Sequence, residues 1–137
     1  MTSNQDPSSG EVYVRLQALG KGAFGEAVLY KKYDTNELVV WKEVNLTRLN
    51  TRNYKEVENE INILSLLNHS NIVAYSNHYF SDTMLYIEME YANGGSLYQL
   101  ICAQDGKLFS EDLVLWYFYQ TVSALEHIHN NNILHRY

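Results

Sequence analysis

The sequence predicts an α+β fold, in which a five-stranded antiparallel sheet carries one helix inserted after its third strand and a helical segment follows. Three observations support this prediction. Short apolar and aromatic runs in the first two-thirds of the chain alternate with polar residues at a period of two, which is typical of strands. Within residues 51–67, apolar residues recur at helical spacing instead. After Asn93-Gly94-Gly95 the pattern is helical only.

The composition is that of a globular protein, with 137 residues of which 46% are hydrophobic and 19% charged. The net charge of −6 argues against nucleic-acid or anionic-membrane partners, since both need a positive surface. No apolar run approaches the ~18 residues of a membrane span, and no signal peptide is visible. Because Cys102 is the sole cysteine, intramolecular disulfides are excluded, and we expect a reducing, cytoplasmic location.

The first part of the chain predicts a tail and three strands. Residues 1–10 are polar and end in Pro, Ser and Gly, so we expect a disordered tail. Residues 11–33 alternate around a glycine-rich centre and predict a two-strand hairpin. After a turn rich in polar residues, residues 38–44 form the predicted third strand.

The remaining elements follow from the same two periods. Residues 51–67 predict the inserted helix, and residues 72–80 and 84–91 predict the last two strands. A short helix is expected at about 96–104 and a long one at about 110–130, whose first residue is a good N-cap serine. The long helix is apolar on nearly every side, which predicts an exposed surface open to self-association, a chaperone or another partner.

Residues 20–25 have the pattern G-x-G-x-x-G, which alone is a weak signal. A dinucleotide-binding turn requires a helix directly after the glycines, whereas a strand is predicted here, so that interpretation fails. A glycine loop between two antiparallel strands can still fold over phosphates, because its bare N–H groups approach closely.

Lys42 is an unusual residue for its position, because it shares the apolar face of the third strand with Val40 and Val44. One interpretation is that its stem covers apolar surface while the ammonium group reaches water. The other is an ion pair with the inserted helix, where Glu60 lies on the apolar stripe. Glu56 is a competing partner, and we favour Glu60 because apolar residues flank it on both sides.

Six segments follow one another along the chain: the glycine loop, Val39-Val40-Trp41-Lys42, Glu60, His69-Ser70-Asn71-Ile72-Val73, Met89-Glu90-Tyr91-Ala92-Asn93-Gly94-Gly95-Ser96-Leu97 and Ile133-Leu134-His135-Arg136. In this order they resemble the segments of eukaryotic protein kinases, and the resemblance extends from residue 16 to 136. The loop and the third strand resemble those of the NIMA-related serine/threonine kinases, and in particular the branch that carries RCC1-type repeats after the kinase domain.

The resemblance implies a kinase N-terminal lobe at residues 11–92, and the hinge and first helices of an incomplete C-terminal lobe at 93–137. It implies ATP as cofactor with Mg²⁺, a protein substrate, and transfer of the γ-phosphoryl group to Ser or Thr. Lys42 would hold the α- and β-phosphates, and Glu60 would position Lys42. The implied ATP-binding positions are Leu19, Gly20, Lys21, Gly22, Ala23, Phe24, Gly25, Glu26, Ala27, Val40, Lys42, Met89, Glu90 and Ala92.

The chain departs from the kinase pattern in two ways. Ala27 and Val40 exchange the usual large and small residues around the adenine ring, which conserves volume, so we expect adenine binding to survive. After His135-Arg136 kinases have a catalytic Asp, whereas this chain has Tyr137. A phenol with a pKa near ~10 does not replace that carboxylate.

The metal ligands, activation loop and peptide platform of the kinase pattern would lie beyond residue 137. No metal ligand is therefore assigned, and we expect a truncated kinase domain that is inactive as it stands. The alternatives are a non-catalytic interaction module, such as a pseudokinase-like truncated isoform, and an incomplete gene product.

Overall fold

The computed structural model describes residues 3–5, 10–23 and 25–135. The predicted disordered tail, residues 1–10, is wrong for residues 3–5, because these form a short strand that pairs with the next one. The unpaired N–H and C=O groups at the edge of a sheet favour such an addition. The other positions of that predicted tail, apart from Gly10, lie outside the described residues.

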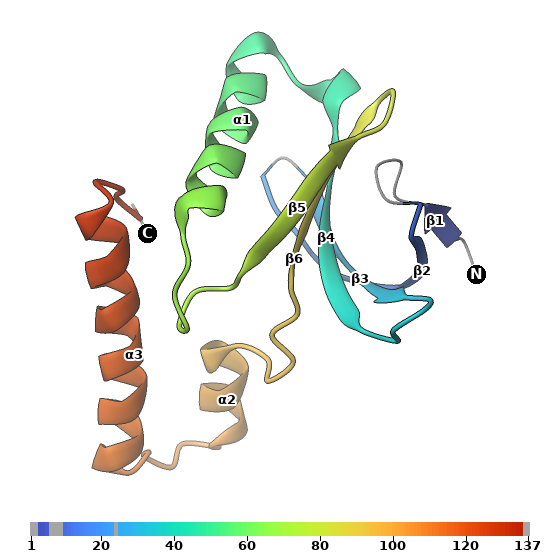
Figure 1. The fold of residues 1–137 in the computed structure, drawn as a ribbon. Coiled ribbons are helices and arrows are strands. Elements are labelled where there is room, and N and C mark those ends of the chain that lie inside the picture. Colours follow the sequence, from blue (N-terminus) through green and yellow to red (C-terminus); the bar gives the residue numbers. More distant parts are fainter. Residues whose placement is uncertain (1–2, 6–9, 24, 136–137) are drawn as a thin grey trace. The chain divides into compact units, whose positions relative to one another are not determined.

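Antiparallel strands form one sheet in the order β1-β2-β3-β4-β6-β5 (Figure 1). The predicted five strands and the helix after the third of them are present, so the α+β fold class is confirmed; β1 adds a sixth strand at one edge. The bounds are β1 (Ser3–Gln5), β2 (Val12–Lys21), β3 (Gly25–Lys32), β4 (Leu38–Asn45), the 3-10 helix η1 (Leu46–Arg48), α1 (Thr51–Leu66), β5 (Tyr75–Phe80), β6 (Met84–Glu90), α2 (Leu97–Ala103) and α3 (Glu111–Asn130).

The chain divides into two compact units, of which the second contains the stretch Leu67–Val73 as well as the residues from Ala92 onward. The sequence predicts that this stretch belongs with the sheet and that β5 begins at residue 72. The predicted start of β5 is too early. The N–H of Ile72 donates to the His69 carbonyl (3.0 Å), and this bond closes a turn before the strand begins.

Within the second unit, side chains of this stretch bind α3. His69 Nε2 lies 3.1 Å from Ser123 Oγ, and Asn71 Nδ2 donates to Gln120 Oε1 (2.9 Å). Ser110 caps α3 as predicted, since its hydroxyl accepts from the Leu113 N–H (3.4 Å). These bonds explain why Leu67–Val73 belongs with the helices.

The sheet of the first unit has an apolar cluster on each face. The face toward α1 buries Val44, Val57, Ile61, Leu85 and Ile87. The opposite face buries the aromatic cluster, defined as Tyr13, Val28, Tyr30, Val39, Trp41 and Tyr79. The two faces are separate because successive residues of β4 project to opposite sides.

The raised pKa values of two tyrosines in the aromatic cluster predict that the protein loses stability at alkaline pH. Burial, followed by a hydrogen bond to Glu43 (2.6 Å), raises the pKa of Tyr30. Burial, followed by hydrogen bonds to Glu11 and Glu88, raises the pKa of Tyr13. A raised pKa contributes stability that is present below the unfolded-state pKa of about 10 and is lost as the pH rises beyond it.

We therefore expect the free energy of unfolding to fall above that pH by about 1.4 kcal/mol per pH unit for each of these tyrosines. Urea unfolding at a series of alkaline pH values measures this slope. Tyr30→Phe should reduce the slope by one tyrosine's share, which separates the effect from general charge repulsion. A free energy that stays level up to pH 12 would contradict the assignment.

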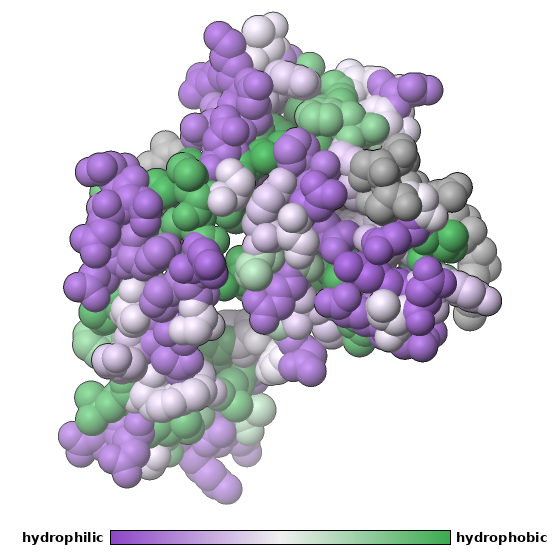
Figure 2. Space-filling view, in the orientation of Figure 1, coloured by the Kyte–Doolittle hydropathy of each residue, from purple (hydrophilic) through white to green (hydrophobic). Residues whose placement is uncertain are grey.

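The surface of α3 is strongly apolar. Phe118 is 65% exposed and Tyr119 72% exposed, and Figure 2 shows hydrophobic side chains at the surface of the second unit. In the described part of the chain, no helix has both the length and the hydropathy needed to cross a membrane.

Candidate nucleotide-binding site

Lys42 on β4 and Glu60 on α1 form the predicted ion pair, with Nζ 2.5 Å from Oε1. Lys42 lies on the same face as Val44, which packs against α1. The two side chains of the pair are 19% and 35% exposed. The interpretation in which the Lys42 ammonium group only reaches water is therefore wrong. Glu56, the competing partner, lies 3.1 Å from Arg52 Nε instead.

Three further predicted contacts share this face of the sheet. Ala27 on β3 is the register partner of Lys42, and Met89 on β6 is the partner of Val40. Because register partners in an antiparallel sheet project to the same side, the four residues form one surface. Ala27 lies diagonally opposite Val40, so the two exchanged side chains are neighbours, as compensation of volume requires.

The glycine loop joins β2 to β3 and closes through a hydrogen bond from the Gly22 N–H to the Gly25 carbonyl (2.8 Å). A Cβ on Gly25 would lie 2.2 Å from the carbonyl oxygen of Glu43, so the neighbouring strand requires glycine there. At Gly20 a Cβ would meet nothing within 4 Å, and at Gly22 nothing closer than 3.6 Å. From the sequence, all three glycines are expected to let the loop approach phosphates. In the structure, Gly25 is also required by the packing of β3 against β4.

The other predicted loop contacts are mostly solvent-exposed. Glu26 is the exception, because it projects to the opposite face, where its carboxylate lies 3.3 Å from Arg15. Its side chain does not join the surface formed around Lys42. Phe24 lies outside the described residues. The exposed positions are Leu19, Lys21 and Ala23.

The two predicted adenine-contacting backbone positions lie in different units. Glu90 ends β6, where its N–H donates to the Ala74 carbonyl (2.8 Å) and its carboxylate accepts from the Ala74 N–H (3.1 Å). Ala92 belongs to the second unit.

The protein kinase domain family matches residues 13–136 of this chain. The chain belongs to the protein kinase family. It is 53% identical over 124 residues to serine/threonine-protein kinase Nek9 of Mus musculus and 51% identical over 124 residues to Nek9 of Xenopus laevis. It is 43% identical over 126 residues to serine/threonine-protein kinase Nek1 of Mus musculus. The resemblance to NIMA-related serine/threonine kinases is confirmed.

These alignments cover 90%, 90% and 92% of this kinase chain but 13%, 13% and 10% of the three relatives. The chain therefore spans about a tenth of the length of each of these relatives.

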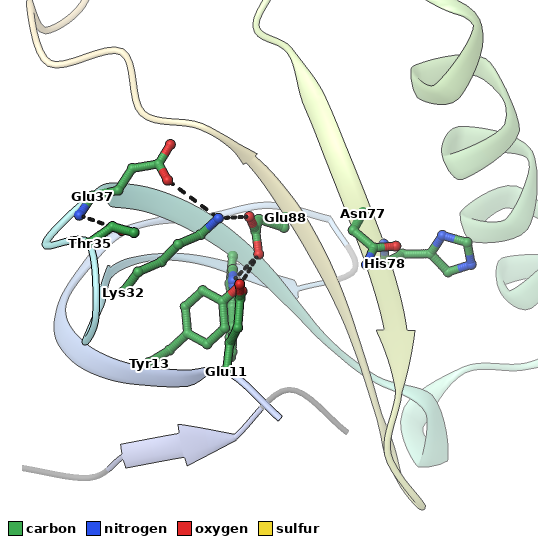
Figure 3. Close-up of polar contacts among 9 residues, drawn as sticks. Glu11, Tyr13, Lys32, Thr35, Glu37, Asn77, His78 and Glu88 are labelled. Atoms are coloured by element: carbon green, nitrogen blue, oxygen red, sulfur yellow. Dashed lines mark hydrogen bonds and ion pairs between the residues drawn. The ribbon is translucent and has the colours of Figure 1, made fainter. Parts of the chain in front are cut away.

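This kinase chain also contains a polar cluster that sequence analysis did not predict (Figure 3). The Glu88 carboxylate accepts from Tyr13 Oη (2.9 Å) and Trp41 Nε1 (3.3 Å), and it lies 3.2 Å from Lys32 Nζ. Burial by itself lowers the pKa of Lys32, but hydrogen bonds and charge from Glu88 and Glu37 outweigh it, so the pKa is raised. The cluster depends on the β4–β6 register, which no local pattern reveals.

Proposed function

We propose that this chain is the ATP-binding part of a serine/threonine protein kinase, which transfers the γ-phosphoryl group of ATP to a protein hydroxyl. The observation that carries the proposal is the ion pair between Glu60 on α1 and Lys42, which lies on the same sheet as the exposed glycine loop. A lysine ammonium has three donors, so those not used by Glu60 can bind the α- and β-phosphates. The exposed loop around Gly20 and Gly22, where no side chain blocks a close approach, would cover the phosphates.

The adenine ring would lie against the surface formed by Ala27, Val40 and Met89. These side chains are apolar and half-buried or buried, which suits the face of a purine ring. The backbone of Glu90, which ends β6 in the same unit, would bind the edge of the ring, as the resemblance implies.

The transfer step needs groups that we do not assign to this chain. Mg²⁺ supplies charge neutralisation of the phosphates in kinases. Across the described ranges, no three His, Cys, Asp or Glu residues gather to hold a metal ion. Tyr137, which lies outside the described residues, occupies the position of the catalytic Asp. Because a tyrosine phenol does not replace that carboxylate, we propose that the chain binds nucleotide without transferring phosphate at a useful rate. We also propose a cytoplasmic location, which the single cysteine, Cys102, supports.

Titration of the chain with ATP tests the nucleotide site. We expect a millimolar Kd, and Lys42→Ala should weaken it about tenfold, because a hydrogen bond to a charged group contributes ~1.5–3 kcal/mol. Lys55→Ala is the matched control, since it removes the same charge from an exposed position of α1. Equal affinities for the two variants would contradict the proposal.

A second candidate function is a non-catalytic interaction module, which the exposed apolar residues of α3 favour. The same titration separates the two functions. An interaction module predicts no nucleotide affinity that depends on Lys42.

A further inference from the structure

Glu88 stands out because it is charged and only 4% exposed. A buried carboxylate is costly unless donors satisfy it. Here Tyr13, Trp41 and Lys32 all contact it, and the cationic donor contacts the oxygen that the other two leave free. The carboxylate is thus compensated by the charge of Lys32, by the Trp41 hydrogen bond and by the Tyr13 hydroxyl, whose single proton it shares with Glu11.

The three partners of Glu88 come from three different strands. Tyr13 belongs to β2, Lys32 to β3 and Trp41 to β4, while Glu88 itself lies on β6. The last three of these strands carry the proposed nucleotide contacts on their opposite face. A bond network that fixes the strands on one face therefore also fixes the spacing of the side chains on the other.

Trp41 links this network to Lys42, its immediate neighbour on β4. The indole is fully buried, stacks on Tyr30 with ring centroids 4.2 Å apart, and lies 4.4 Å from the ring of Tyr13. The hydrogen bond from Nε1 to Glu88 fixes the ring in its plane. The pairing of β4 with β3 and β6 sets which face Lys42 occupies, and the fixed indole ring adds to this by holding the backbone of Trp41 and its neighbour Lys42 in place.

Lys42 has a flexible stem, so its ammonium group depends on two constraints. One is the contact with Glu60, and the other is the direction of the strand at its Cα. Placement of a binding group to within a fraction of an ångström requires such support from neighbouring residues.

We propose that Glu88 is a positioning residue for Lys42: through the Trp41 indole it holds this part of β4 at the position from which the Lys42 ammonium group is directed toward the phosphates of a nucleotide. This inference rests on the proposed ATP binding. It predicts a specific loss of phosphate recognition when Glu88 is neutralised, while recognition of the adenine ring remains.

The test compares ATP with adenosine, which lacks the phosphates, in NMR titrations of the full 137-residue chain. Glu88→Gln keeps the volume of the side chain and removes its charge. Glu37→Gln is the matched control, because Glu37 also lies near Lys32 Nζ (3.4 Å) but its side chain is 59% exposed (Figure 3). Trp41→Phe removes the indole donor together with part of the buried ring, and it decides the question if Glu88→Gln does not fold.

We expect Glu88→Gln and Trp41→Phe to reduce the preference for ATP over adenosine about three- to tenfold, the usual size of coupling within one hydrogen-bond network. Glu37→Gln should leave the preference unchanged. In a Lys42→Ala background, Glu88→Gln should have no further effect on that preference, because the residue through which it acts is absent.

A general loss of folded protein lowers both affinities by the same factor and leaves their ratio unchanged. An unchanged ratio in Glu88→Gln and Trp41→Phe therefore overturns the inference. If the unmodified chain shows no preference for ATP, or if Lys42→Ala does not reduce that preference, the proposed function itself fails and the inference fails with it.

Discussion

Replacing Gly25 by alanine is expected to destabilise the first unit by at least about 3 kcal/mol, a large part of the stability of an ordinary domain. The added Cβ would lie 2.2 Å from the Glu43 carbonyl oxygen, 3.0 Å from the Glu43 carbonyl carbon and 3.1 Å from Val44 Cγ2. Two of these atoms are backbone in the middle of β4, so relief requires the separation of two paired strands.

Urea unfolding of Gly25→Ala, Gly20→Ala and Gly22→Ala measures the effect. The second and third variants are matched controls, because their added Cβ atoms would meet nothing within 4 Å and nothing within 3.6 Å, respectively. We expect both to unfold close to the midpoint of the unmodified chain. A midpoint for Gly25→Ala equal to theirs would show that β4 yields to the added methyl group without cost.

The exposed face of α3 is expected to cause self-association of the chain. Leu115, Phe118, Tyr119 and Val122 follow the helical spacing of one stripe, and their exposures are 54%, 65%, 72% and 44%. Each apolar side chain buried in a contact contributes ~1.5–3 kcal/mol. A combined Leu115→Gln, Phe118→Gln and Tyr119→Gln variant should therefore weaken self-association about 100-fold or more.

Light scattering over a concentration series measures this association. Tyr33→Gln is the matched control, since Tyr33 is 67% exposed but lies in the first unit, in the turn after β3. It should associate as the unmodified chain does. An unmodified chain that remains a monodisperse monomer would contradict the prediction.

Local periodicity was sufficient for the described strands other than β1, for the α-helices and for the central pair of the site. Alternation along β4 placed Lys42 on the apolar face, and the helical stripe of α1 favoured Glu60 over Glu56 as its partner. Both inferences depend on a residue's immediate neighbours, whose directions are set by periods of about 2 and 3.6 residues. The Lys42–Glu60 contact confirms them across 18 residues of sequence.

Register and close approach could not be predicted in this way. Glu88 meets Trp41 across 47 residues only because β6 is inserted beside β4, and Gly25 meets Glu43 only because β3 and β4 pair in one particular register. The sequence alone therefore determined five of the six described strands, the α-helices and which face Lys42 occupies, but not β1 or the start of β5. The tertiary structure decided which strands adjoin and at what offset, because those contacts depend on segments far apart in the chain.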